Sequence, residues 1–88
     1  MARPVAPCDV CSRVDALVGP ISALGDDAMR ALMCVIHHAY AVLEGGSEED
    51  VAALREAVAS LVDVLPEAAR SLAGELSDMA ARVRVEAQ

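Results

Sequence analysis

Apolar residues recur at spacings of three and four along most of this chain, and such spacing is typical of amphipathic α-helices. The clearest run is Val51, Leu54, Val58, Leu61 and Leu65. No segment shows the alternation of apolar and polar residues that predicts a β-strand, and no hairpin signal is present. The chain has 88 residues, enough for one domain. The sequence therefore predicts an all-α fold, a small three- or four-helix bundle.

Glycine, proline and capping residues set the limits of the first two helical segments. Ser12 is a suitable N-cap for the first segment, which should stop at Gly25. Pro20 lies inside this segment, so we expect a kink or a break there. The second segment follows with an acidic first turn and should end at Gly45–Gly46.

The third segment begins with a capping box, in which Ser47 is the N-cap and Asp50 the third helical residue. Pro66 then either starts a fourth helix or kinks one long helix. We treat the chain as a single domain, residues 1–88, comprising an N-terminal arm, 1–11, and a helical bundle, 12–88.

The predicted core lacks large side chains. Tyr40 is the only aromatic residue of the chain. Phe and Trp bury the most area per residue, so a small domain without them is weakly stabilised by its core. Such domains often depend on a metal ion, a disulfide or a second subunit.

Two groups of residues suggest a metal ion in this role. Cys8 and Cys11 are spaced as a chelating pair, and Cys34 is followed by His37 and His38 at i+3 and i+4. On a helical wheel these three residues of the second segment lie opposite its aliphatic residues. If the first two helices fold into an antiparallel hairpin, Cys11 should lie level with His38 and within a turn of Cys34.

A zinc ion suits these ligands best. Three cysteines and one histidine form a common closed tetrahedral structural site, with His38 as the preferred fourth ligand and His37 as the alternative. We therefore expect a structural zinc ion held by Cys8, Cys11, Cys34 and His38, which fastens the N-terminal arm to the bundle. An iron–sulfur cluster, free thiols and a reversible disulfide remain open as alternatives.

The charge of the chain excludes some classes of partner. The formal net charge is −7, and the seven basic residues, all arginine, are scattered along the chain. A nucleic-acid-binding protein would need a basic patch, so nucleic-acid binding is not expected. The sequence has neither an apolar stretch long enough for a membrane span nor a signal-peptide pattern, so we expect a cytoplasmic protein.

The sequence shows no motif for catalysis, a cofactor or a small-molecule substrate, so we expect a protein that is not an enzyme. Our first hypothesis is a small adaptor or regulator that binds a protein partner, or a second copy as a homodimer, through helix-mediated contacts. Its partner-binding residues would be Leu54, Leu61, Leu65, Leu72 and Met79. The alternative for each of these is a place in the domain's own core.

Two further hypotheses concern function. Oxidation or metal loss at Cys8, Cys11 and Cys34 would make the protein a metal- or redox-responsive switch. The acidic composition alone would suit a decoy of a nucleic-acid-binding protein.

Overall fold

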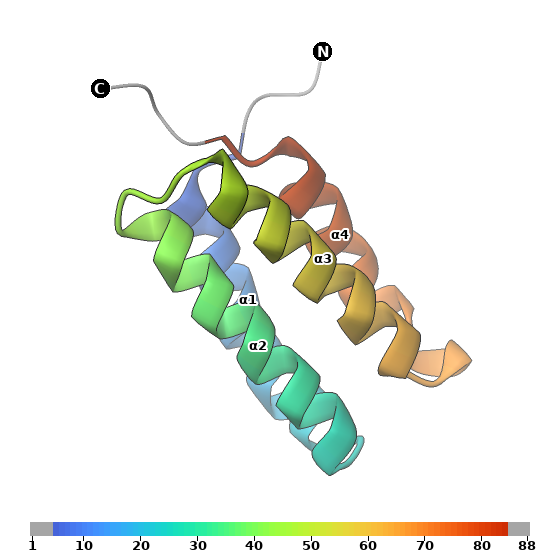
Figure 1. Ribbon diagram of the computed structural model, residues 1–88. Coiled ribbons are helices and arrows are strands. Elements are labelled where there is room, and N and C mark those ends of the chain that lie inside the picture. The colour runs from blue at the N-terminus through green and yellow to red at the C-terminus, as the bar shows by residue number, and fades with distance from the viewer. Residues whose placement is uncertain (1–4, 85–88) are drawn as a thin grey trace.

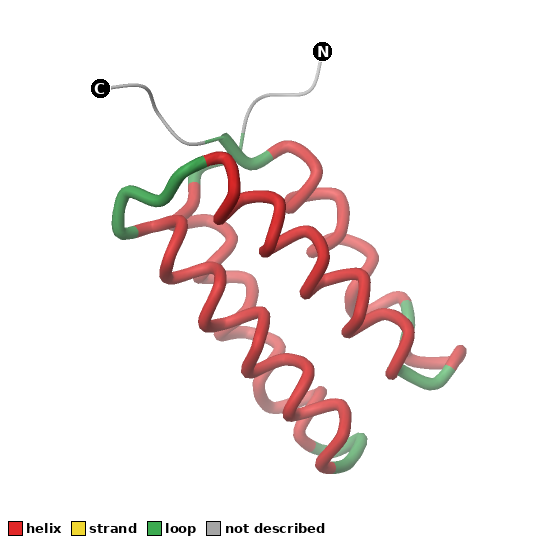
Figure 2. The backbone as a smooth tube through the Cα atoms, viewed as in Figure 1, coloured by secondary structure: helices red, strands yellow, loops and turns green. Residues whose placement is uncertain are grey.

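The computed structural model describes residues 5–84, which form four α-helices packed as an antiparallel bundle (Figure 1). The helices are α1 (Pro7–Ser22), α2 (Asp26–Leu43), α3 (Glu48–Val64) and α4 (Ser71–Arg82), and a 3-10 turn (Glu67–Ala69) precedes α4. Short loops join successive helices, as Figure 2 shows. Within the described range the only β-type pairing is an isolated bridge between Val5 and Val83. The all-α prediction is confirmed.

Helix α1 differs from the prediction at its start. It begins at Pro7 and not after Ser12, so the part of the expected arm from Pro7 onward is helical. Proline is favoured at a first helical position because its missing N–H would have no partner there. The helix also continues through Pro20 and ends at Ser22. Pro20 therefore lies in the last turn of α1 and does not break the helix. Residues 1–4 of the expected arm lie outside the described residues.

The boundaries of α2 and α3 follow the sequence signals closely, whereas α4 begins at Ser71 and not at Pro66. Gly45 adopts a positive φ of 91° directly after α2. The backbone N–H of Ser47 donates to the Asp50 carboxylate at 2.8 Å, as the predicted capping box requires. Helix α3 ends at Val64, and Pro66 lies in extended backbone before the 3-10 turn. Pro66 therefore separates two helices.

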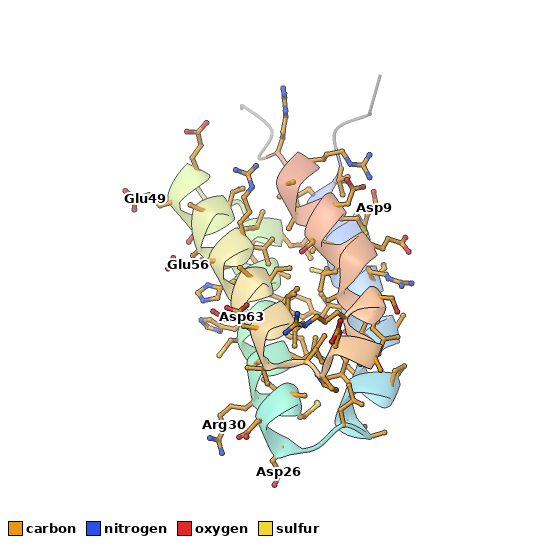
Figure 3. All side chains as sticks on the ribbon, turned by 90° about the vertical axis from the view of Figure 1, so that its right-hand side faces the viewer. Asp9, Asp26, Arg30, Glu49, Glu56 and Asp63 are labelled. Atoms are coloured by element: carbon orange, nitrogen blue, oxygen red, sulfur yellow. The ribbon has the colours of Figure 1, made fainter. Side chains whose placement is uncertain are left out.

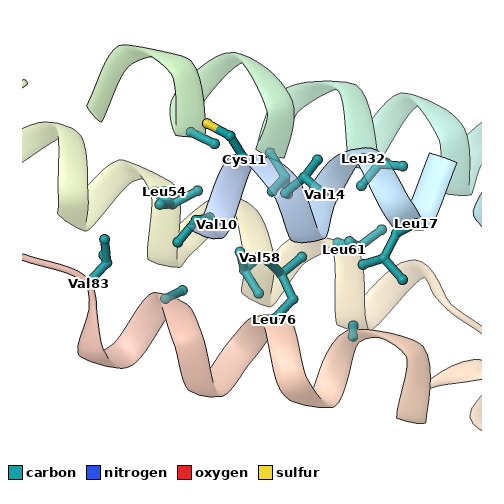
Figure 4. Close-up of a cluster of buried hydrophobic side chains, with 14 of the residues drawn as sticks. Val10, Cys11, Val14, Leu17, Leu32, Leu54, Val58, Leu61, Leu76 and Val83 are labelled. Carbon is teal, nitrogen blue, oxygen red and sulfur yellow. The ribbon is translucent and has the colours of Figure 1, made fainter. Parts of the chain in front are cut away.

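The core runs along the axis of the bundle and, within residues 5–84, its buried side chains are all apolar (Figure 4). Helix α2 packs against α1 and α3, whereas α4 packs against α3 and α1. Helices α2 and α4 therefore lie diagonally across the bundle. The contact between α1 and α4 is the smallest of the four helix contacts.

Two links join elements that are distant in sequence. Arg55 of α3 donates from Nε to the Ala80 carbonyl oxygen at 2.9 Å, near the C-terminal end of α4. Such a contact satisfies a carbonyl and suits the negative end of the helix dipole. At the same end of the bundle the Val5 N–H donates to the Arg82 carbonyl at 3.1 Å, and the Arg84 N–H donates to Val5 at 3.4 Å.

Candidate functional site

Cys8 and Cys11 lie in the first two turns of α1, and the helix gives them different environments. Cys8 is exposed, whereas Cys11 is buried in the core cluster. Figure 4 shows the Cys11 sulfur directed toward α2. The two thiols therefore do not form the open metal-binding knuckle that their spacing suggested, because only one of them faces solvent.

Cys34 and His38 lie on the edge of α2 that faces α3. Both line a shallow groove between these helices, together with Glu56 and small residues of α3. Cys34 is exposed and His38 is half-buried. His37 is exposed, and its ring centroid lies 5.5 Å from that of His38. The Cys34–His38 pair thus lies on the α3 side of α2, while Cys11 belongs to α1.

The structure does not bring the predicted ligand set together. Among residues 5–84, no group of three or more His, Cys, Asp or Glu side chains could hold a metal ion. Cys11 is buried in the core cluster, whereas Cys8 is exposed on α1, and Cys34 and His38 line the groove beside α3. Structural zinc stays a prediction, and elemental analysis of the purified chain tests it.

The three thiols should differ in reactivity. Burial raises the pKa of the Cys11 thiol, and the nearby Asp15 carboxylate and Cys8 raise it further. Since the thiolate is the reactive form, we expect a maleimide or iodoacetamide to modify Cys8 and Cys34 first and Cys11 last at neutral pH. Mass spectrometry of peptides from a labelling time course measures this order. In denaturant the modification rates of the three thiols should converge. Rapid modification of Cys11 in the folded protein would contradict its buried position in the core.

The five predicted partner-binding residues divide into two groups. Leu54, Leu61 and Leu65 are buried at 0%, 0% and 2% exposure, so these three face the domain's own core. Leu72 and Met79 of α4 are only partly buried and pack against the edge of the core. The buried part of the apolar run of α3 is therefore covered within the domain, where α3 packs against α2 and α4.

An open groove lies between α1 and α4, where the helix contact is smallest. We call it the α1–α4 groove. The residues that line it include Ser12, Arg13 and Ala16 of α1 and Glu75, Met79 and Arg82 of α4. It thus combines the apolar Met79 and Ala16 with charged side chains of both signs.

Arg13 is the most unusual residue of this groove. Its Nη2 lies 3.4 Å from the Glu75 carboxylate, and its Nε is buried without a hydrogen-bond partner. Buried polar atoms are nearly always hydrogen-bonded, so this donor shows that the Arg13 guanidinium is not fully satisfied by the domain. A second ion pair links Arg82 to Asp78 at 2.7 Å. The groove can therefore receive an apolar side chain next to an anionic group.

A second exposed apolar surface, on α2, was not predicted from the sequence. Met33 and Tyr40 of α2 are 59% and 41% exposed, and they lie two helical turns apart on one side of the helix. Their separation of seven residues, which is visible in the sequence, is the signal that predicts a shared face.

No protein-family model matches this sequence, and neither a curated protein nor a solved structure is significantly similar to it. In the described part of the chain, none of the helices has the length and apolar character that crossing a membrane requires.

Proposed function

We propose that this protein is a small helical interaction module that binds an acidic, partly apolar segment of a partner protein in the α1–α4 groove. The observation that carries the proposal is Arg13, whose side chain lines the open groove, is 33% exposed and has only one ion pair within the described residues. A partner carboxylate would bind the exposed part of this guanidinium through a charge-assisted hydrogen bond. Met79 and Ala16 would contact the neighbouring apolar side chain of the partner.

The groove offers an acidic partner one weakly paired arginine. Arg82 is already paired with Asp78, Arg13 is paired with Glu75, and Asp9 also lines the groove, so the groove has no net positive charge of its own. The Arg13–Glu75 pair is long at 3.4 Å, and its side chains are 33% and 63% exposed, so the pair is weak. A partner carboxylate can therefore join Arg13 without displacing a strong ion pair.

Selection of helical peptides from a displayed library against the full chain tests this function. We expect enrichment of peptides that carry a Leu or Met next to an Asp or Glu. Titration of one selected peptide should show that Arg13→Gln weakens binding about tenfold or more, since a hydrogen bond to a charged group contributes roughly 1.5–3 kcal/mol. Met79→Ala should also weaken it.

Arg70→Gln is the matched control, because Arg70 is an exposed arginine next to the 3-10 turn and does not line the groove. Its affinity for the same peptide should equal that of the unchanged protein. Selected peptides that bind equally well to Arg13→Gln, or that are basic, would contradict the proposal.

A further inference from the structure

One side of α2 presents an unbroken row of exposed residues at alternating spacings of three and four. We call it the α2 stripe: Arg30, Met33, His37, Tyr40 and Glu44. All five are exposed, although α2 is packed on its other sides against α1 and α3. A repeat of three and four is the pattern by which two helices pack along each other.

The middle of the α2 stripe is apolar enough to be buried by a partner. Met33 is the most exposed of the large apolar side chains in residues 5–84, at 59%, and Tyr40 is 41% exposed. Met, Tyr and Arg are the residue types enriched in protein interfaces. The flexible thioether of Met33 also suits contact with an aromatic ring.

The two ends of the α2 stripe carry opposite charges. Arg30 and Glu44 each lie seven residues from His37, so they are about 21 Å apart along the helix. Figure 3 shows Arg30 directed away from the bundle near the start of α2. Neither residue has an ion-pair partner within the described part of the chain. Both charges are therefore available to a second molecule.

The opposite charges at the two ends of the α2 stripe make it complementary to a second, antiparallel copy of itself. If a second copy packs its α2 stripe antiparallel against the first, Arg30 of each copy lies near Glu44 of the other, and the Met33–Tyr40 segments overlap in the middle. A parallel arrangement would instead place like charges together. We propose that the chain forms an antiparallel, two-fold symmetric homodimer through the α2 stripe.

The proposed dimer is closed, because each copy uses the same patch. It also leaves the α1–α4 groove free, since α2 does not contact α4 and lies diagonally across the bundle from it. The α2 stripe and the α1–α4 groove are therefore separate surfaces.

Sedimentation equilibrium at several concentrations in 0.15 M salt tests the dimer, because salt at that level screens the net charge of −7 on each copy. We expect a concentration-dependent dimer that Met33→Glu abolishes. Arg30→Glu and Glu44→Arg should each weaken self-association about tenfold, since each turns two attractive pairs into repulsive ones.

Mixing the two charge variants gives the decisive result. Arg30→Glu and Glu44→Arg together form a heterodimer in which both pairs are again attractive, so the mixture should associate as tightly as the unchanged chain. The double variant should recover as well. A strict monomer at all concentrations, or a mixture that stays as weak as its components, would overturn the proposal. Far-UV circular dichroism checks that each variant remains helical.

Cross-linking provides a second readout of the surface. Cys8 and Cys34 are both exposed, but only Cys34 lies beside the α2 stripe, near the middle of α2. A bifunctional maleimide should therefore cross-link Cys8→Ser into dimers and should fail with Cys34→Ser. The opposite pattern would place the interface on α1 and overturn the proposal.

Discussion

Leu61→Ala is expected to lower the free energy of unfolding by about 2–5 kcal/mol. Leu61 is 0% exposed and belongs to the core that α3 shares with the other helices (Figure 4). Removing its side chain loses the transfer free energy of the buried groups and leaves a cavity. The free energy of unfolding of a whole domain is about 5–15 kcal/mol, so the loss is a large fraction of its stability. Urea denaturation followed by circular dichroism measures it.

Val64→Ala is the control for this variant, since Val64 lies three residues further along α3 and is 44% exposed. It should change stability by less than about 1 kcal/mol. The absence of Phe and Trp makes the contrast informative, because no large ring in the core can move to fill the cavity left at Leu61. Equal losses at the two positions would contradict the burial of Leu61.

Gly46→Ala is expected to lower the free energy of unfolding by about 1–3 kcal/mol, as overpacking does. A Cβ at this position would lie 2.7 Å from the Ala41 carbonyl oxygen and 2.9 Å from the Asp50 Cβ. Both contacts are too short, and Asp50 is held by the capping box at the start of α3. The turn between α2 and α3 would have to shift to relieve these contacts. Thermal unfolding measures the resulting loss of stability.

Gly74→Ala should have the opposite effect. Gly74 lies inside α4, and a Cβ there would meet nothing within 4 Å. Alanine at a helical position reduces the entropy lost on folding, so we expect a gain of about 0.5–1 kcal/mol. If both glycine variants were destabilised to the same extent, the close approach at Gly46 would not explain the first result.

The sequence allowed most of the fold to be predicted, because local signals decided it. The capping box at Ser47 and Asp50 and the separation of α3 from α4 at Pro66 each depend on residues within one turn. The start of α1 was predicted wrongly, although Pro7 is itself a helix-start signal. The cysteine spacing suggested a non-helical arm, and that interpretation outweighed the signal.

The candidate sites were harder to predict because they depend on how helices rotate against one another. A wheel placed Cys34 and His38 on one face of α2, but it did not show which neighbouring helix that face meets. In the structure it meets α3 and not α1. Likewise the apolar spacing identified Leu54 and Leu61 but did not show whether their own chain covers them.

The pairing of Val5 with Val83 has a consequence for how the native state opens. The first and last helices share the smallest helix contact, and this bridge closes it at one end with two main-chain hydrogen bonds. Separating α1 from α4 must break that bridge, but it leaves the α2–α3 packing in place. The bridge therefore holds together the pair of helices with the smallest contact, α1 and α4. We expect the strength of the bridge to set how often the side chains between these two helices become exposed to solvent.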